Sequence, residues 1–265
     1  MSTNSPSGTG APKSSLSNPV TGVVVQARMA STRLPGKVLM PIGDVPMIGR
    51  LLRRLSFAAV DTIIVATSTE PADDPIADYA GSEGVRCFRG SEQDVLSRYC
   101  GAARTFGLDG VVRVTADNPF TDPWAITELL NVSREQPLAY VHNVHPDGYP
   151  YGTGAELVPV SFLTEVAEST SDPRWREHVT LGVRVQPSKY LQVAVPAPSV
   201  LRGLPYCFSV DYPEDLAFVR ELWARCNYRD DVRLVEMLEL LRSNPDLVRN
   251  CGAPRRSFEA QEGKL

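Results

Sequence analysis

The chain has 265 residues, of which 43% are hydrophobic and 22% are charged, a composition that can bury one sizeable core. Its formal net charge of −4 excludes a general electrostatic attraction to nucleic acid or to anionic membranes. Any basic binding site must therefore be local.

The first half of the chain alternates between strands and helices. Residues 1–19 consist almost wholly of Ser, Thr, Asn, Gly and Pro, which predicts a disordered tail. From there on, apolar runs alternate with segments of helical period. Strands are expected at residues 20–27, 61–67, 85–90 and 110–116, and helices at residues 46–59, 73–84, 93–107 and 122–133. This alternation predicts an α/β fold in which a mostly parallel sheet carries helices on both faces.

Side-chain spacing gives more detailed predictions for two of these helices. In the helix at residues 46–59 the apolar residues share one stripe, whereas Arg50, Arg53 and Arg54 fall elsewhere. These three arginines are expected on a solvated face. In the helix at residues 93–107, Asp94 precedes the apolar stripe and is expected to cap the exposed N–H groups of the first turn.

Beyond residue 131 the pattern loosens into a stretch rich in glycine, proline and tyrosine. The elements expected there are helices from about residue 161 and over residues 173–186, a strand over 190–197, a short apolar segment at 206–210, and helices over 213–226 and 230–244. We assign residues 20–250 to one domain, residues 140–190 within it to the acceptor substrate, and residues 251–265 to a polar tail.

The five cysteines are scattered and odd in number, and they lack the C-x-x-C spacing of a zinc site or a redox motif. They are expected to be buried and reduced. No apolar stretch approaches the roughly 20 residues of a membrane helix, and the N-terminus lacks the apolar core of a signal peptide. We therefore expect a soluble cytoplasmic protein without a membrane or nucleic-acid partner.

A cluster of positive charge follows directly on the first strand. Arg28, Arg33 and Lys37 lie within ten residues, and Gly36 lets the backbone turn between them. The segment fits neither the Walker A pattern nor G-x-G-x-x-G. Cationic side chains and turn amides suit a polyphosphate, and an ordinary charged loop is the alternative. In a doubly wound sheet, ligands bind beside the carboxyl ends of strands, where this loop is expected.

Two acidic residues also follow apolar strand-like runs. Asp117 comes after residues 111–115, and Asp211 comes after residues 208–210. Magnesium bound to a nucleotide takes one or two protein carboxylates beside phosphate oxygens and water, so this pair could supply its protein ligands. The alternatives are a turn-forming role for Asp117 and a helix cap for Asp211.

Several stretches resemble one enzyme family. “QARMASTRLPGKVL”, with “IGDVPMIGRLLRRL” behind it, resembles the opening signature of the CMP-KDO synthetase and acylneuraminate cytidylyltransferase family, and “VDYPEDLAFV” resembles its closing one. “GSEQDVLSRY”, “RVTADNPFTDP” and “REHVT” are most similar to the spore-coat-polysaccharide branch of this family. The resemblance covers about residues 20–245, with the motifs in the right order.

The resemblance implies a Rossmann-like GT-A nucleotidyltransferase fold and the transfer of CMP from CTP to a small anionic acceptor, with release of pyrophosphate. It further implies that Arg28, Arg33 and Lys37 hold the triphosphate and that Asp117 and Asp211 hold Mg²⁺. The catalytic residues that it implies are Arg28, Lys37, Asp117 and Asp211. The remaining nucleotide-binding residues that it implies are Gln26, Ala27, Gly36 and Ser91. The family also suggests a homodimer built on residues 140–190.

Chemistry of this kind requires little covalent help from the protein, because positioning and charge neutralisation supply most of the rate. The sequence departs from the family at two places. “ADNP” stands where the KDO enzymes have Gly-Asp-Glu-Pro, so a carboxylate beside Asp117 is missing. The sugar-binding residues of the KDO enzymes find no match in residues 140–180, which leaves the acceptor open.

Three residues are candidates for binding the acceptor: Tyr151, Glu156 and His178. Glu156 begins an apolar strand after two glycines that could let a ligand approach the backbone. His178 could donate to an acceptor anion or orient a hydroxyl. A buried helix histidine with a satisfied hydrogen bond is the alternative for His178.

Two other functions fit the same residues. A glycosyltransferase that consumes a nucleotide sugar shares the fold and uses strand-end aspartates, although the D-x-D motif is missing where “ADNP” stands. A catalytically silent nucleotide-binding regulator is the second alternative. Against it, the cations and carboxylates that the chemistry needs are all present.

Overall fold

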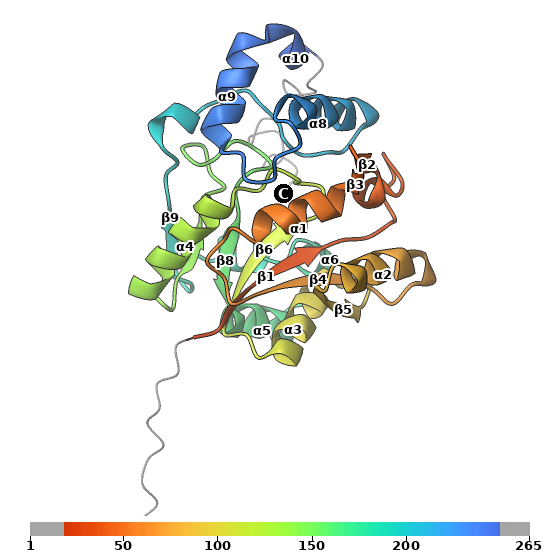
Figure 1. Cartoon of the computed structure of the whole chain (residues 1–265). Coiled ribbons are helices and arrows are strands. Elements are labelled where there is room, and N and C mark those ends of the chain that lie inside the picture. The colour runs from red at the N-terminus through yellow and green to blue at the C-terminus, as the bar shows by residue number, and fades with distance from the viewer. Residues whose placement is uncertain (1–18, 250–265) are drawn as a thin grey trace, which may run out of the picture.

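A seven-stranded sheet forms the centre of the protein (Figure 1), as seen in a computed structural model that describes residues 19–249. In spatial order the strands are β5 (Arg86–Gly90), β4 (Thr62–Ser68), β1 (Thr21–Gln26), β6 (Gly110–Thr115), β8 (Glu156–Pro159), β7 (Tyr140–His142) and β9 (Gln192–Ala194). The first four run parallel, β8 is antiparallel to β6 and to β7, and β9 is parallel to β7. The predicted α/β fold is confirmed.

Helices cover both faces of the sheet because alternate residues of each strand point to opposite sides. Val23 and Val25 belong to one buried cluster and Val24 to the other. The helices on the face of Val23 and Val25 are α1 (Met47–Leu55), α2 (Asp74–Ser82) and α4 (Pro123–Glu135), with α8 (Pro213–Arg225), α9 (Leu234–Ser243) and α10 (Pro245–Arg249) packed beyond them. Those on the opposite face are α3 (Val95–Phe106), α5 (Val160–Ser169), α6 (Pro173–Glu177) and α7 (Leu181–Arg184).

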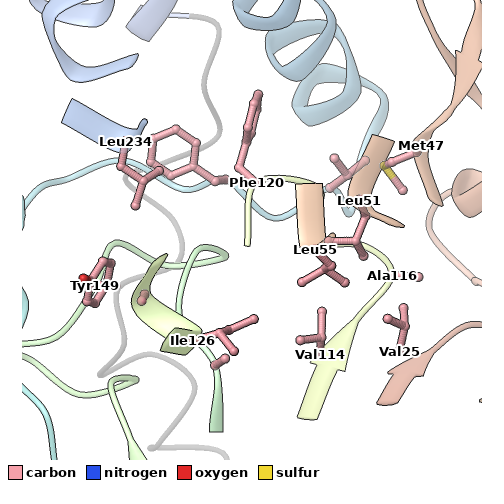
Figure 2. Packing of buried hydrophobic residues seen from close by; sticks show 14 of the residues in the cluster. Val25, Met47, Leu51, Leu55, Val114, Ala116, Phe120, Ile126, Tyr149 and Leu234 are labelled. Atoms are coloured by element: carbon pink, nitrogen blue, oxygen red, sulfur yellow. The ribbon is translucent and has the colours of Figure 1, made fainter. Parts of the chain in front are cut away.

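The larger core lies between the sheet and α1 (Figure 2). Val25 of β1 and Val114 of β6 stand on adjacent strands and point toward Leu51 and Leu55 of α1. All four side chains are buried, and burying a side chain of this size contributes about 1.5–3 kcal/mol relative to leaving it exposed. This packing fixes α1, and with it the loop that connects β1 to α1.

The order of strand addition reverses at β1. From β1 the chain adds β4 and β5 on one side and then crosses over to add β6 on the other. The carboxyl ends of β1 and β6 therefore lie side by side, with Gln26 opposite Thr115. Open α/β sheets bind ligands in the crevice at such a switch point.

The remaining elements include several that the sequence did not predict. The helix expected over residues 173–186 is wrong, because the chain breaks at Val179, with φ 24°, into α6 and α7. The segment at residues 206–210 forms only an isolated bridge between Tyr151 and Cys207. The apolar strand expected from Glu156 is confirmed as β8. The elements without a sequence signal are β7, a hairpin of β2 (Pro41–Ile42) and β3 (Val45–Pro46), and the 3-10 helices η1 (Lys37–Leu39), η2 (Pro71–Asp73) and η3 (Ser199–Leu201).

Smaller expectations can also be compared with the structure. Asp94 caps α3 as predicted, accepting a hydrogen bond from the Ser97 amide at 2.8 Å. The four cysteines within residues 19–249 form no disulfide with one another, and the expected burial holds for Cys207 and Cys226 but not for the half-buried Cys87 and Cys100. Cys251, the tail at residues 1–18 and the tail at residues 251–265 lie outside the described residues. Within the described range, no helix combines the length and apolar character needed to cross a bilayer.

The solvated face expected for the arginines of α1 is wrong for two of them. Only Arg53 is exposed, whereas Arg50 and Arg54 are buried. Arg54 donates to the backbone carbonyls of Asp230 at 2.8 Å and Val232 at 3.0 Å. Burial lowers the pKa of Arg54 to about 10, although the carboxylates of Asp122 and Asp230 oppose the shift. Arg54 therefore ties α1 to the chain that leads into α9, a contact that helical periodicity cannot reveal.

We predict that Arg54→Ala lowers the free energy of unfolding by about 3 kcal/mol, because it leaves a cavity and two buried carbonyls without their donor. Arg53→Ala on the same helix is the matched control and should stay within about 0.5 kcal/mol of the native protein. Urea unfolding followed by circular dichroism measures both. Equal stability of the two variants would contradict this role for Arg54.

Candidate functional site

A cleft with a volume of about 680 Å³ opens at the switch point of the sheet. Six arginine and lysine residues and four acidic residues line it within the described part of the chain. The predicted site residues that border it are Gln26, Ala27, Arg28, Arg33, Lys37, Asp117, Tyr151, Glu156, His178 and Asp211. Gly36 and Ser91 do not border it. The fold thus gathers ten of the twelve predicted residues around one cavity.

At the centre of the cleft, the ammonium of Lys37 joins Asp117, which follows β6, to Asp211, which follows the segment with the isolated bridge rather than a strand. Lys37 Nζ donates to Asp117 Oδ2 at 2.8 Å, to Asp211 Oδ1 at 3.0 Å and to the carbonyl of Val210 at 2.6 Å. Arg33 also contacts Asp211 Oδ1, at 2.7 Å. The two aspartates therefore converge on one point, and two of the cations predicted to bind phosphates contact carboxylates in this structure.

The carboxylate of Asp211 faces these cations rather than the helix that follows it. Asp215 accepts hydrogen bonds from the backbone amides of Asp211 and Tyr212, both at 2.9 Å, and so caps α8. The alternative of a helix cap for Asp211 is thereby excluded. Burial alone would raise the pKa of Asp211, but the charge and hydrogen bond of Lys37, together with Arg33, hold it below its usual value. Asp211 is thus held as a carboxylate.

The basic loop is held open by backbone contacts. Gly36 has φ 69°, a left-handed conformation that favours glycine, and its amide donates to the carbonyl of Met29 at 3.0 Å. The amide of Met29 donates to Asp73 Oδ1 at 2.7 Å. Asp73 is buried and also accepts from Ser68, at the end of β4. Gly36 thus shapes the loop without lining the cleft, and Asp73 anchors it from a neighbouring strand.

Of the three residues expected near the base and ribose, two line the cleft and one does not. Gln26 lines the cleft, and its Oε1 accepts from the hydroxyl of Tyr99 at 3.3 Å. Ala27 lines it too, and its amide donates to the carbonyl of Ala66 at 3.1 Å. Ser91 is exposed, and its hydroxyl oxygen accepts from the Asp94 amide instead. In this structure Ser91 stabilises the turn before α3.

The opposite wall of the cleft is built around Glu156. Its Oε2 accepts from Arg113 at 2.7 Å, and its Oε1 accepts from the hydroxyls of Tyr140 and Thr180. Glu156 is 5% exposed. Burial would raise the pKa of Glu156, but the charge of Arg113 and the hydroxyl hydrogen bonds lower it. Glu156 therefore stays ionised and holds this wall in one arrangement.

Tyr151 and His178 lie at the wall and at the rim of the cleft. His178 is exposed and follows the last residue of α6, so the alternative of a buried helix histidine is wrong. The two glycines before Glu156 line the cleft, but protein atoms fill the space where a side chain would stand. A Cβ on Gly152 would lie 2.5 Å from the Ser209 amide nitrogen, and one on Gly154 would lie 2.7 Å from Asn143 Oδ1. These glycines therefore allow close packing within the protein itself.

A divalent cation of the kind that CTP carries would find two protein carboxylates here. Asp117 and Asp211 approach closely enough to contact the same ammonium. No cluster of three or more His, Cys, Asp or Glu residues suited to a metal occurs among the described residues. Magnesium commonly takes only one or two carboxylates and completes its shell with phosphate oxygens and water. The pair fits a metal that arrives with a nucleotide, and not a cage that holds a metal alone.

Four polar residues of the site escaped the sequence analysis: Asp73, Arg98, Arg113 and Arg184. Arg113 interrupts the apolar strand β6, and a charge inside a buried strand was a signal available in the sequence. Arg98 follows Val95 by three positions and so falls on the buried stripe of α3. Arg184 and Asp73 carried no such signal, because only the meeting of distant segments brings Arg184 to the cleft and Asp73 to the Met29 amide of its loop.

Comparisons with known proteins identify a consistent set of relatives. The family model described as Cytidylyltransferase matches residues 22–202. The spore coat polysaccharide biosynthesis protein SpsF of Bacillus subtilis (strain 168) is 32% identical over 229 residues, which span 84% of this chain and 94% of the relative.

Solved structures agree with the sequence comparison. A cytidylyltransferase from Leptospira borgpetersenii superposes with a TM-score of 0.80 at 28% identity, over 87% of this chain and 97% of that one. A CMP:2-keto-3-deoxy-manno-octonic acid synthetase complexed with CTP superposes with a TM-score of 0.56 at 20% identity, over 78% and 99% of the two chains. The latter likeness supports the fold alone.

We predict that Glu156→Gln costs about 3 kcal/mol of stability at pH 7, because Arg113 is left without its buried partner. Since the pKa of Glu156 in the folded protein lies below its unfolded value of about 4.3, its contribution is complete above that pH and is lost as the pH falls through the folded-state pKa. As the pH falls through that range, Glu156→Gln should therefore lose less stability than the native protein does. Thermal unfolding from pH 3 to pH 7 measures both effects.

The control is Glu165→Gln, which alters an exposed ion pair with Lys189. Its melting temperature should stay close to that of the native protein. If Glu156→Gln also melts like the native protein at pH 7, Glu156 does not hold the wall of the cleft.

Proposed function

The chain belongs to the cytidylyltransferase family, and from this membership we propose that it transfers CMP from CTP to a small anionic acceptor and releases pyrophosphate. The observation that carries the proposal is the convergence of Arg33, Lys37, Asp117 and Asp211 in one cleft at the switch point. Family membership also decides against the glycosyltransferase alternative.

In the proposed reaction an acceptor oxygen attacks the α-phosphorus of CTP. A bond forms between this oxygen and the α-phosphorus while the bond to the bridging oxygen of pyrophosphate breaks, and pyrophosphate leaves with that electron pair. The basic side chains of the β1–α1 loop would face the charge that grows on the leaving group. The protein therefore acts by orienting the two substrates and neutralising charge.

Asp117 and Asp211 would hold Mg²⁺ when it enters with CTP, and the ion would supply neutralisation of the phosphate oxygens. Lys37 donates hydrogen bonds to both aspartates in this structure, so its first role would be to keep the two carboxylates together. Arg33 holds Asp211 from the solvent side, since its side chain is half exposed. These contacts would preserve the spacing of the carboxylates before the nucleotide arrives.

The far end of the cleft would bind the acceptor. Arg113, Arg184 and His178 border this end and give it a basic character that suits an anion such as a sugar acid, a phosphorylated small molecule or a phosphonate. Glu156 would position Arg113 rather than contact the acceptor, because both of its carboxylate oxygens accept hydrogen bonds from the protein. Tyr151 would line the passage between the two ends.

The function is tested by a panel of nucleoside triphosphates crossed with acidic sugars, phosphorylated small molecules and phosphonates, with Mg²⁺ and pyrophosphatase present. We expect phosphate release that depends on CTP and on one class of acid. Mass spectrometry should then detect the CMP adduct of that acid. Phosphate release with UTP but not with CTP would contradict the proposal.

A second prediction concerns the aspartate pair. Asp117→Asn and Asp211→Asn should each lower turnover strongly, and the double variant should be little worse than the worse single one, because groups that act as a unit give non-additive losses. Turnover over a magnesium titration, with thermal melts beside it, measures this. Near-normal turnover of Asp211→Asn at saturating magnesium would remove Asp211 from the site.

A further inference from the structure

The basic residues of the cleft differ in whether a carboxylate already neutralises them. Lys37 and Arg33 contact Asp117 and Asp211, and Arg113 contacts Glu156. Arg28 and Arg98 also border the cleft, yet neither forms an ion pair with any residue in the described range 19–249. The site thus contains two cations without a counter-ion.

Arg98 is the less ordinary of the two, because it is only 2% exposed. It lies in the first turns of α3, where its Nη1 donates to the carbonyls of Ser91 at 2.6 Å and Glu92 at 3.3 Å. Its Nε is buried and has no hydrogen-bond partner within the structure. The two carbonyl contacts hold the guanidinium in place at the cleft wall, while part of its donor capacity remains unused.

Arg28 makes the environment of Arg98 still more positive. Burial and the like charge of Arg28 lower the pKa of Arg98. The charges of Asp73 and Glu92, which form no ion pair with Arg98, act to raise it. Asp73 accepts hydrogen bonds from Met29 and Ser68. A buried cation without a paired anion is costly to a fold. A cleft wall that carries the buried Arg98 beside the exposed Arg28, neither with a paired carboxylate among the described residues, suits an anionic ligand.

We propose that Arg98 extends the triphosphate site expected around Arg28 into an anion subsite beside α3, in which Arg98 takes phosphate oxygens of the bound nucleotide. The proposal rests on the proposed function for the identity of the ligand. Guanidinium groups present planar forks of donors that match phosphate oxygens. The guanidinium of Arg98 is held by the carbonyls of Ser91 and Glu92 before the nucleotide binds, whereas Arg28 is an exposed side chain on the loop whose Met29 amide Asp73 holds.

The subsite is tested by binding measurements without a metal, using inorganic tripolyphosphate, CTP and cytidine as probes. Arg98→Gln keeps a donor for the Ser91 carbonyl and removes the charge. We expect its affinity for tripolyphosphate and for CTP to fall roughly tenfold or more, as the loss of a charge-assisted hydrogen bond implies. Its affinity for cytidine, followed by ligand-observed NMR, should stay unchanged. Calorimetry measures the affinities for tripolyphosphate and for CTP.

Three further variants keep the test decisive. Arg104→Gln removes an exposed charge from the same helix and should leave all three affinities unchanged. Arg28→Gln alters an exposed loop residue whose side chain forms no hydrogen bond or ion pair with the described residues, so it should fold normally and show the same loss for the two phosphate-bearing probes. Arg98→Lys should retain more affinity for tripolyphosphate than Arg98→Gln.

Unchanged affinity of Arg98→Gln or Arg28→Gln for tripolyphosphate would overturn the subsite. So would an equal loss for cytidine, since that result would assign Arg98 to the nucleoside. Failure of the proposed function has a different signature, because a native protein that binds tripolyphosphate but never turns over CTP with any acid would leave the subsite intact.

Discussion

The contact on which the site depends is the one between the Lys37 ammonium and the carboxylates of Asp117 and Asp211. Lys37 follows the first strand of the sheet, Asp117 follows β6, and Asp211 lies 174 residues beyond Lys37 in the chain. One buried cation thus joins three distant segments at the carboxyl ends of two neighbouring strands. The buried carboxylate of Asp211 and the half-buried one of Asp117 would repel each other at this separation without it. The lysine therefore contributes to the architecture as well as to the chemistry of the cleft.

Around α1, farther from the cleft, buried cations again join distant segments of the chain. Arg54 reaches the carbonyls of Asp230 and Val232, and Arg50 reaches the carbonyl of Tyr228. The C-terminal segments are thus attached to the N-terminal α/β unit by buried cations as well as by apolar packing. Since Asp211 belongs to the same C-terminal part of the chain, these contacts help to bring the second aspartate to the switch point.

The two ends of the cleft differ in how their charges are arranged. At the wall that carries Glu156, ionic and hydroxyl groups satisfy one another's hydrogen bonds. At the end near α3, the positive charges of Arg28 and Arg98 are not matched by contacting carboxylates. A pre-formed wall and an unneutralised basic patch are suited to different tasks, one to select a substrate and the other to attract a polyanion.

Much of this protein could be read from the order of its residues. The alternation of apolar runs and helical periods determined the α/β fold, because period-2 and period-3.6 patterns reflect local backbone geometry. The positions of Arg28, Lys37, Asp117 and Asp211 after apolar strands likewise indicated a site at one edge of the sheet. These signals are local, and the structure places these residues around one cleft, as expected.

Only the tertiary structure decided which groups pair with which. The helical period predicted that Arg54 faces solvent, yet its side chain is buried and donates to backbone carbonyls of a distant segment. Glu156 looked like a ligand for the acceptor, but Arg113, Tyr140 and Thr180 occupy its oxygens. Arg184 gave no sign of belonging to the cleft, and Asp73 gave none of anchoring the loop beside it. Such pairings depend on which segments meet in space, and the free energy of a charge depends on its neighbours and its burial, neither of which is a property of local sequence.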